Sequence, residues 1–146
     1  MRGKLIEEAK FQTLYPGGQY TGTGPVTCYG RPIDTQQYDE AVFAVDAASV
    51  LANNTLTALV VENSIADGVG AVAVTGASFT AMTSSNYTTT QFGSVICKNT
   101  KRFLFLKTTL AGGGGDPTVS FGARVALSKA DVQAVNNAPV FDVDNL

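Results

Sequence analysis

Short apolar segments with β-strand character, separated by turn signals, recur along most of this chain. They follow one another at intervals of roughly 8–14 residues between Asp39 and about Lys129. The segments are 41–45 (running on towards Val50), 56–61, 69–79, 92–97, 102–110 and 118–127. A count of about seven strands at this spacing predicts an all-β fold, with a body that is a β-sandwich, jelly-roll-like, or a barrel.

One of these segments constrains the arrangement further. In Phe103-Leu104-Phe105-Leu106 successive residues are all apolar, so both faces of the strand are apolar. Such a strand is expected to lie centrally in a sheet with both sides covered. The segments 92–97 and 102–110 are separated by a short polar turn, which predicts a β-hairpin between them.

The ends of the chain differ from its middle, and the sequence divides into three parts. Residues 1–38 are expected to form an extended N-terminal arm, 39–129 the β-sandwich body and 130–146 a C-terminal tail. Apolar residues within 2–11 have near-helical spacing, which favours a helical turn or two there. The stretch 15–25 holds four glycines and two prolines, which argues against a regular element. A second short helix is expected to begin at Ser128, placed as its N-cap.

Both expected arms carry aromatic or bulky apolar side chains. Such side chains on an extended segment usually dock on another surface, in the same chain or a neighbour. A Gly-rich arm would be disordered in the free subunit and fixed on assembly. The sequence therefore predicts that neighbouring subunits bury the following partner-binding residues: Leu14, Tyr15, Tyr20, Val140 and Phe141.

The composition argues against enzymatic chemistry. The chain has 146 residues, which suits one domain, and contains no His and no Trp. Without His, the usual proton shuttle and the commonest metal ligand are missing. Neither cysteine has an imidazole to activate it, and the glycines at 112–115 are followed by Asp116 and Pro117 rather than the Lys and Ser/Thr of a phosphate-binding loop. Asp142 and Asp144 would share a face of an extended segment, but Ca²⁺ needs about six ligands. We expect no catalysis, no cofactor and no metal.

The charge balance and the cysteines limit the partners and the compartment. A formal net charge of −2 argues against a nucleic-acid partner. The one basic concentration comprises Lys98, Lys101, Arg102 and Lys107. It is interpreted as decoration of a strand edge or turn, with a patch for phosphate or an acidic partner as the alternative. No apolar run is long enough for a signal peptide or a membrane span, so we expect no membrane partner. We therefore also expect synthesis in a reducing compartment, which favours free thiols at Cys28 and Cys97.

The run Phe92-Gly93-Ser94-Val95-Ile96-Cys97-Lys98-Asn99-Thr100-Lys101-Arg102-Phe103-Leu104-Phe105-Leu106 resembles part of a known group of proteins. These are small β-rich structural proteins of tailed bacteriophages, the head decoration (cement) proteins, and segments 58–68 and 121–127 fit the same layout. The family often ends its last strand in a His-Pro-Arg-like segment, where this chain has Leu127-Ser128-Lys129-Ala130.

The resemblance implies a structural role without catalysis. The chain would sit on the outer surface of the capsid, after assembly in the host cytoplasm, and bridge neighbouring copies of the major capsid protein. It would also bind itself, with a homotrimer favoured and a dimer possible. Linked contacts of this kind gain strength from avidity.

Two other functions remain open on the sequence. One is another phage structural protein, such as a tail-tube, connector or fibre-base protein. The other is a carbohydrate-binding β-sandwich. Such modules usually stack sugars on exposed Trp or Tyr, and here Trp is absent.

Overall fold

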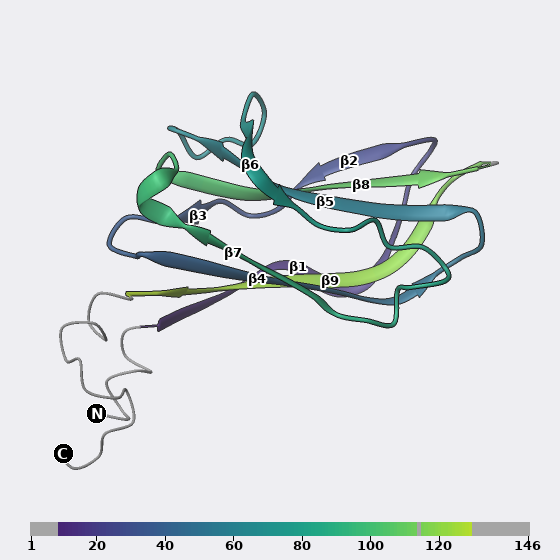
Figure 1. Ribbon diagram of the computed structural model, residues 1–146. Helices are drawn as coiled ribbons and strands as arrows, with labels where there is room; N and C mark the ends of the chain where they lie inside the picture. Colours follow the sequence, from purple (N-terminus) through teal and green to yellow (C-terminus); the bar gives the residue numbers. More distant parts are fainter. Residues whose placement is uncertain (1–8, 114, 130–146) are drawn as a thin grey trace, which may run out of the picture.

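A computed structural model describes residues 9–113 and 115–129 of the chain (Figure 1). Two antiparallel sheets pack face to face, which confirms the predicted all-β sandwich. The described residues form nine strands rather than about seven: β1 (Ala9–Thr21), β2 (Val26–Tyr29), β3 (Ile33–Asp34), β4 (Glu40–Val50), β5 (Asn54–Asn63), β6 (Val72–Ser78), β7 (Gln91–Ile96), β8 (Phe103–Gly112) and β9 (Thr118–Ser128). A single 3₁₀ turn, η1 (Cys97–Asn99), completes them, so this part of the chain has no helix long and apolar enough to cross a bilayer.

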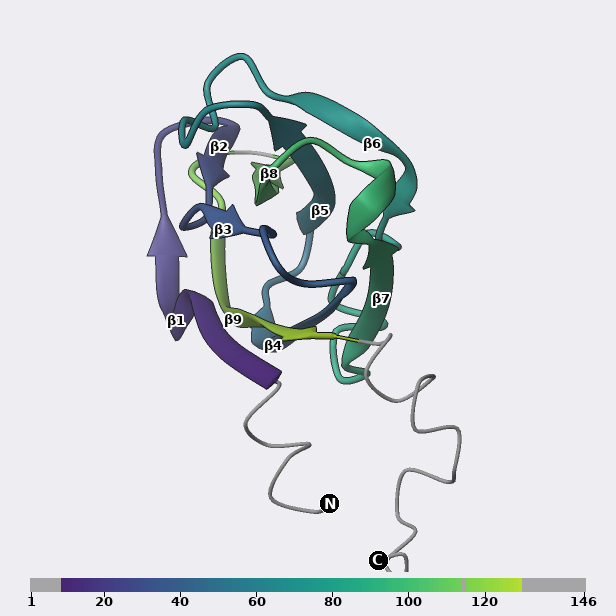
Figure 2. The same cartoon turned by 90° about the vertical axis from the view of Figure 1, so that its left-hand side faces the viewer.

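The strand order is that of a jelly roll. One sheet has four strands in the order β1-β9-β4-β7, and the other has the order β2-β8-β5-β6 with the short β3 also paired to β8. With β3 set aside, the first strand pairs with the last, the second with the last but one, and so on inwards. This nesting is what results when a long antiparallel hairpin rolls up into two sheets. Figure 2, seen from one end, shows the strands enclosing a single interior.

The predicted hairpin between 92–97 and 102–110 is wrong. Strand β7 pairs with β4 in the four-stranded sheet, whereas β8 pairs with β5 in the other sheet. The turn η1 carries the chain from one sheet to the other. It is held in place by Cys97, which is buried and whose N–H donates to the carbonyl of Asp39 (2.9 Å). The expectation for residues 103–106 is confirmed: β8 is flanked by β2 and β5, and Leu104, Phe105 and Leu106 are all buried.

The described part of the expected N-terminal arm belongs to the sandwich. Residues 9–21 form β1, which pairs along its whole length with β9, and β2 and β3 join the other sheet. This corrects the helical turn expected within 2–11 for its described residues 9–11, since 2–8 lie outside the described residues. It also corrects the irregular stretch expected at 15–25 for residues 15–21, whereas 22–25 form an irregular loop as expected. The glycines and Pro16 do not end the strand, because its register shifts between Thr13 and Gly18 absorb them as bulges at a sheet edge. The helix expected from Ser128 and the tail 130–146 fall mostly outside the described residues, and Ser128 itself ends β9.

The core lies between the two sheets and is built by alternation along the strands. In β4 the odd-numbered residues Ala41, Phe43 and Val45 point inwards, and in β9 the inward set includes Val125 and Leu127. Each of these side chains is nearly or fully inaccessible to solvent. A sandwich of this size can be stabilised by hydrophobic burial without a disulfide, and both cysteines of this one are free.

Candidate interaction surfaces

The predicted partner-binding residues of the N-terminal segment lie in the chain's own core. Leu14 is 2% exposed and Tyr15 is 6% exposed. Both sit on β1, and pairing with β9 turns them towards the second sheet. The prediction that a neighbouring subunit buries them is therefore corrected: the core of the same chain already does so. Sequence analysis did not predict this long edge strand because the local glycines and prolines argue against regular structure.

Tyr15 links the two sheets through its hydroxyl group. This hydroxyl donates to the backbone carbonyl of Leu106 (2.9 Å) and accepts a hydrogen bond from the hydroxyl of Thr108 (3.1 Å), both on β8. Burial is the main cause of a raised Tyr15 pKa, and the bond from Thr108 opposes that rise only in part. The tyrosine thus acts as a neutral, hydrogen-bonded strut within the core.

Tyr20 is half-buried beside the same cluster. Its ring lies 6.1 Å from that of Tyr15 in an edge-on arrangement and 4.8 Å from that of Phe121. Its hydroxyl donates to the carbonyl of Pro16 (2.7 Å) across the bulge of β1. Tyr20 thus braces the bulge from within the chain, and its exposed part can still touch a neighbour. Val140 and Phe141, the remaining predicted contacts, lie outside the described residues.

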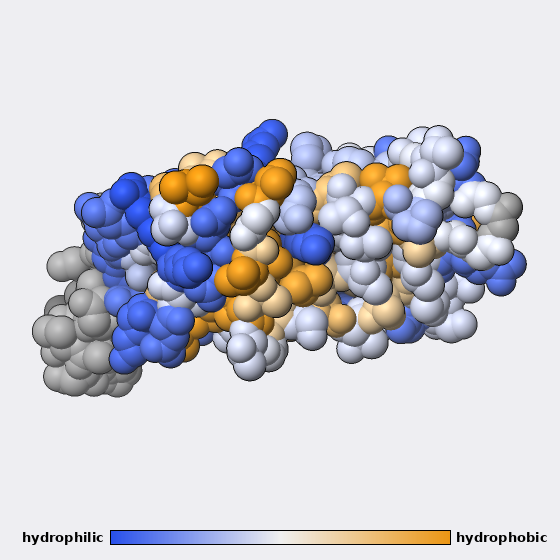
Figure 3. All heavy atoms as spheres, turned by 90° about the horizontal axis from the view of Figure 1, so that it is seen from above, coloured by the Kyte–Doolittle hydropathy of each residue, from blue (hydrophilic) through white to orange (hydrophobic). Residues whose placement is uncertain are grey.

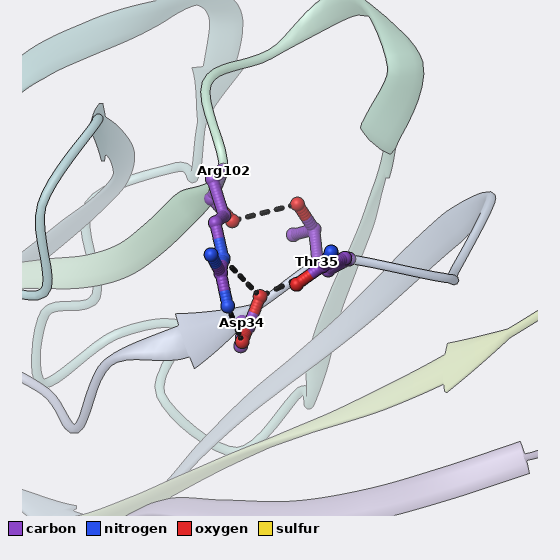
Figure 4. Close-up of polar contacts among 4 residues, drawn as sticks. Asp34, Thr35 and Arg102 are labelled. Atoms are coloured by element: carbon purple, nitrogen blue, oxygen red, sulfur yellow. Dashed lines mark hydrogen bonds and ion pairs between the residues drawn. The ribbon is translucent and has the colours of Figure 1, made fainter.

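The basic cluster is partly taken up by structural contacts. The Nε and Nη2 of Arg102 donate to the two carboxylate oxygens of Asp34 (3.0 and 2.8 Å), and the hydroxyl of Thr35 donates to the Arg102 carbonyl (2.7 Å), as Figure 4 shows. The Arg102 guanidinium, helped by the backbone N–H of Gln36, lowers the pKa of Asp34 to about 2. The Nζ of Lys107 lies over the ring of Tyr29 at 5.8 Å. These contacts join β3 and β2 to β8, which favours the interpretation as decoration of a sheet over a phosphate site.

The outer face of the four-stranded sheet carries an apolar surface that the sequence analysis did not identify. The strand register aligns its residues in three rows across the sheet. The first row is Ala9, Ser128, Glu40 and Ile96; the middle row is Phe11, Ala126, Val42 and Ser94; the third row is Thr13, Arg124, Ala44 and Phe92. We call these three rows the apolar face; it forms the underside of the sandwich in Figure 1.

The large side chains of the apolar face are unusually exposed. Phe11 is 76% exposed, Phe92 70%, Ile96 45% and Val42 36%. Between Phe11 and Phe92 the surface dips into a hollow of about 300 Å³ whose floor includes the small residues Ala44 and Ala126. Two exposed phenylalanines around one apolar hollow are typical of a contact surface.

A signal for this surface was present in the sequence. Val42 and Ala44 alternate with Phe43 and Val45, so both faces of β4 are apolar, as in residues 103–106. For β8 a covering segment exists, because the loop between β5 and β6 arches over the outer side of this sheet (Figure 1), and Gly68 of this loop packs on Tyr29. Phe105 on β8 is buried. For β4 the outward residues have no such cover within the described chain.

The opposite side of the molecule looks different. Seen from the side of the five-stranded sheet, hydrophobic residues form several small groups separated by polar ones (Figure 3). Exposed Ile65, Val69 and Val72 lie on β6 and the loop before it. Small groups of exposed apolar residues of this kind are common on protein surfaces.

The described residues hold no cluster of side chains that could bind a metal ion. In residues 9–113 and 115–129, no three Cys, Asp or Glu side chains gather closely enough to bind a metal ion. Burial, with smaller contributions from Asp39 and Glu40, raises the pKa of the Cys97 thiol to about 11, so it is a protonated core residue at neutral pH.

The fold resembles that of part of a chain found in a virus particle. The sequence itself matches no known protein family and no curated protein. Particles derived from infectious bursal disease virus contain a chain with a TM-score of 0.54 and 12% identity, covering 83% of this chain and 31% of that one. The VP2 subviral particle of the same virus gives a TM-score of 0.51 and 12% identity, covering 83% and 32%.

A weaker likeness extends to a chain of similar length. The SPBc2 prophage-derived protein YomS has a TM-score of 0.41 and 11% identity, covering 82% of this chain and 93% of that one. Against the viral chains, by contrast, this protein spans about a third of their length. At these identities the comparison establishes the fold: a jelly-roll β-sandwich similar to one found in the infectious bursal disease virus particle.

Proposed function

We propose that this protein is a structural component of a virus particle. The observation that carries the proposal is the nested jelly-roll topology, together with its likeness to a chain that builds viral particles. A fold alone does not define a function. The exposed apolar face supplies the second support, because a protein whose task is to hold others together needs contact surfaces rather than a cleft.

In its specific form, the protein decorates the outer surface of a bacteriophage capsid and bridges neighbouring copies of the major capsid protein. The resemblance of residues 92–106 to phage head decoration proteins supports this form. The protein binds the capsid protein and itself, as a trimer on the sequence argument or as a dimer. The role is mechanical and requires no catalysis, cofactor, metal ion, nucleic acid or membrane.

Co-sedimentation with capsid shells that lack the protein tests this proposal. Saturable binding of the full chain, with a fixed number of copies per shell, is the expected result. A variant without residues 1–8 and another without 130–146 test the flanking segments and leave the strands intact. A larger N-terminal deletion is unsuitable, because it would remove β1 and its pairing with β9.

Two outcomes would redirect the proposal. If the protein ignores shells and forms rings or tubes by itself, the tail-tube alternative is favoured. If it ignores shells but binds specific glycans on an array, the carbohydrate-binding alternative is favoured. Either result refutes the decoration role.

A further inference from the structure

We infer that the apolar face is a self-association surface on which a second copy of this chain packs about a two-fold axis. The axis lies in the plane of the contact and runs along the middle row, from Phe11 to Ser94. This inference rests on the structural role proposed above. It deepens that role by naming one partner and the surface that the partner binds.

The face has the properties of one half of a sheet-on-sheet contact. It is four strands wide, and its middle row presents two large apolar side chains, Phe11 and Val42, around the small Ala126. Two sheets can pack through such faces at about 10 Å, with strands nearly aligned. The same packing already forms the interior of the sandwich.

The register makes this face complementary to itself. Rotation about the middle row places the first row of one copy on the third row of the other and keeps each strand over its own equivalent. Ile96 then meets Phe92 of the second copy, and the reverse contact forms as well. Phe11 meets its own equivalent on the axis. All four of the most exposed apolar side chains of the face therefore find apolar partners.

The charges also match under this rotation. Glu40 in the first row comes to lie over Ala44 of the second copy, directly beside Arg124 on the neighbouring strand. Two symmetric Glu40–Arg124 pairs result, one on each side of the axis. Arg124 is free to contribute, since its contact with Asp46 within the chain is long (3.7 Å) and exposed.

The other simple two-fold axis, parallel to the strands, fits less well. It would exchange β1 with β7 and β9 with β4. Phe11 would then face Ser94, and Phe92 would face Thr13. Arg124 would lie over Ala44, with Glu40 far along the strand, so both the apolar and the charged matches would be lost. The geometry therefore selects the axis along the middle row.

The size of the face sets the expected strength. Four strands spaced by about 4.8 Å and three rows spaced by about 6.8 Å give roughly 400 Å² of projected area per copy. A total near 800 Å² is below the usual size of a stable interface, so the dissociation constant is expected on the order of 100 µM. On a particle, where other contacts hold both copies, this weak pairing becomes effectively intramolecular.

Sedimentation equilibrium of the full chain, from about 10 µM to about 1 mM, tests the contact in a range that brackets the expected constant. The expected result is a monomer–dimer equilibrium. Phe92→Ser should weaken it roughly tenfold or more, because the substitution acts twice in a symmetric contact. Val72→Ser, an exposed apolar residue on β6 of the other sheet, is the matched control and should leave the equilibrium unchanged.

A charge exchange tests the axis itself. Arg124→Glu should weaken the dimer, because it places two carboxylates together, and Glu40→Arg in the same chain should restore it. A short bismaleimide should join two copies of Ser94→Cys, which lies on the axis, but not of Ser78→Cys on β6. Both variants are made with Cys28→Ser, since Cys28 is the more accessible native thiol.

A protein that stays monomeric, forms trimers, or forms dimers insensitive to Phe92→Ser overturns the inference. If a monomer becomes a dimer only after residues 130–146 are removed, the chain's own C-terminal segment occupies the face instead, which also overturns it. The shell-binding assay separates the two proposals. A monomer that binds shells refutes only the two-fold contact, and a dimer that ignores shells refutes only the decoration role.

Discussion

Tyr15 provides the sharpest test of whether the N-terminal segment belongs to the body or to an interface. Tyr15→Phe removes one oxygen atom and leaves the ring packing against Phe121 in place. The carbonyl of Leu106 keeps a hydrogen bond from the N–H of Gly30 (2.9 Å), so it is not left unpaired. The hydroxyl of Thr108, fully buried, loses the acceptor that it has in Tyr15.

The expected loss of stability follows from these contacts. A lost net hydrogen bond is worth about 1 kcal/mol, and a buried polar group left without a partner costs about 1–3 kcal/mol. The free energy of unfolding should therefore fall by about 2–4 kcal/mol. With a urea m-value of about 2 kcal/mol per molar, the unfolding midpoint should fall by about 1–2 M at unchanged m.

The assay is urea unfolding of the full chain, followed by far-ultraviolet circular dichroism. Thr108→Val is the matched variant, and it should cost less than Tyr15→Phe because the tyrosine hydroxyl still donates to Leu106. The double variant should lose about 1 kcal/mol less stability than the sum of the two single losses, because it leaves no unpaired hydroxyl.

The refuting result is equally specific. If Tyr15→Phe leaves the urea midpoint unchanged and instead weakens shell binding or self-association, Tyr15 acts at an interface. The assignment of residues 9–21 to the folded body would then be wrong.

Three further predictions concern the core, an ion pair and a thiol. Leu104→Ala, at a fully buried position, should destabilise the protein by about 2–5 kcal/mol in the same urea assay, and a loss well below this would contradict a packed core there. Asp34→Asn should lower the free energy of unfolding at neutral pH. Because the ion pair with Arg102 holds the pKa of Asp34 at about 2 against 3.8 ordinarily, the difference in stability from wild type should shrink as the pH falls from about 4 to 2. A difference independent of pH would contradict the pairing. At pH 8 a maleimide should label Cys28 well before Cys97, whose pKa is raised to about 11 by burial, and equal rates before unfolding would contradict that burial.

The sequence predicted the fold class because alternation is a local property. Phe103-Leu104-Phe105-Leu106 has two apolar faces, and this alone placed β8 correctly in the middle of a sheet. It could not predict which strands pair, because pairing in a jelly roll joins segments far apart in the chain. Ala9 pairs with Ser128, whereas the adjacent segments β7 and β8 lie in different sheets.

The candidate surface was predicted less well than the fold. Aromatic residues near the N-terminus were expected to meet a neighbour, yet Tyr15 turns inwards and Phe11, four residues earlier, turns outwards. Only the register with β9 decides between these directions, since a shift of one residue exchanges the two faces of a strand. The apolar face also combines residues from all four strands of its sheet, so no single segment reveals it.

The pairing of Ala9 with Ser128 has a consequence for how such a domain can be reused. The first and last described strands begin and end side by side, so the sandwich has a single point of entry and exit. A domain of this kind can be inserted into a loop of a longer polypeptide, or circularly permuted by a short linker across that point, without breaking a sheet. The polar segment 83–90 between β6 and β7 offers a site for the new ends. The architecture therefore suits insertion as a module into a longer chain.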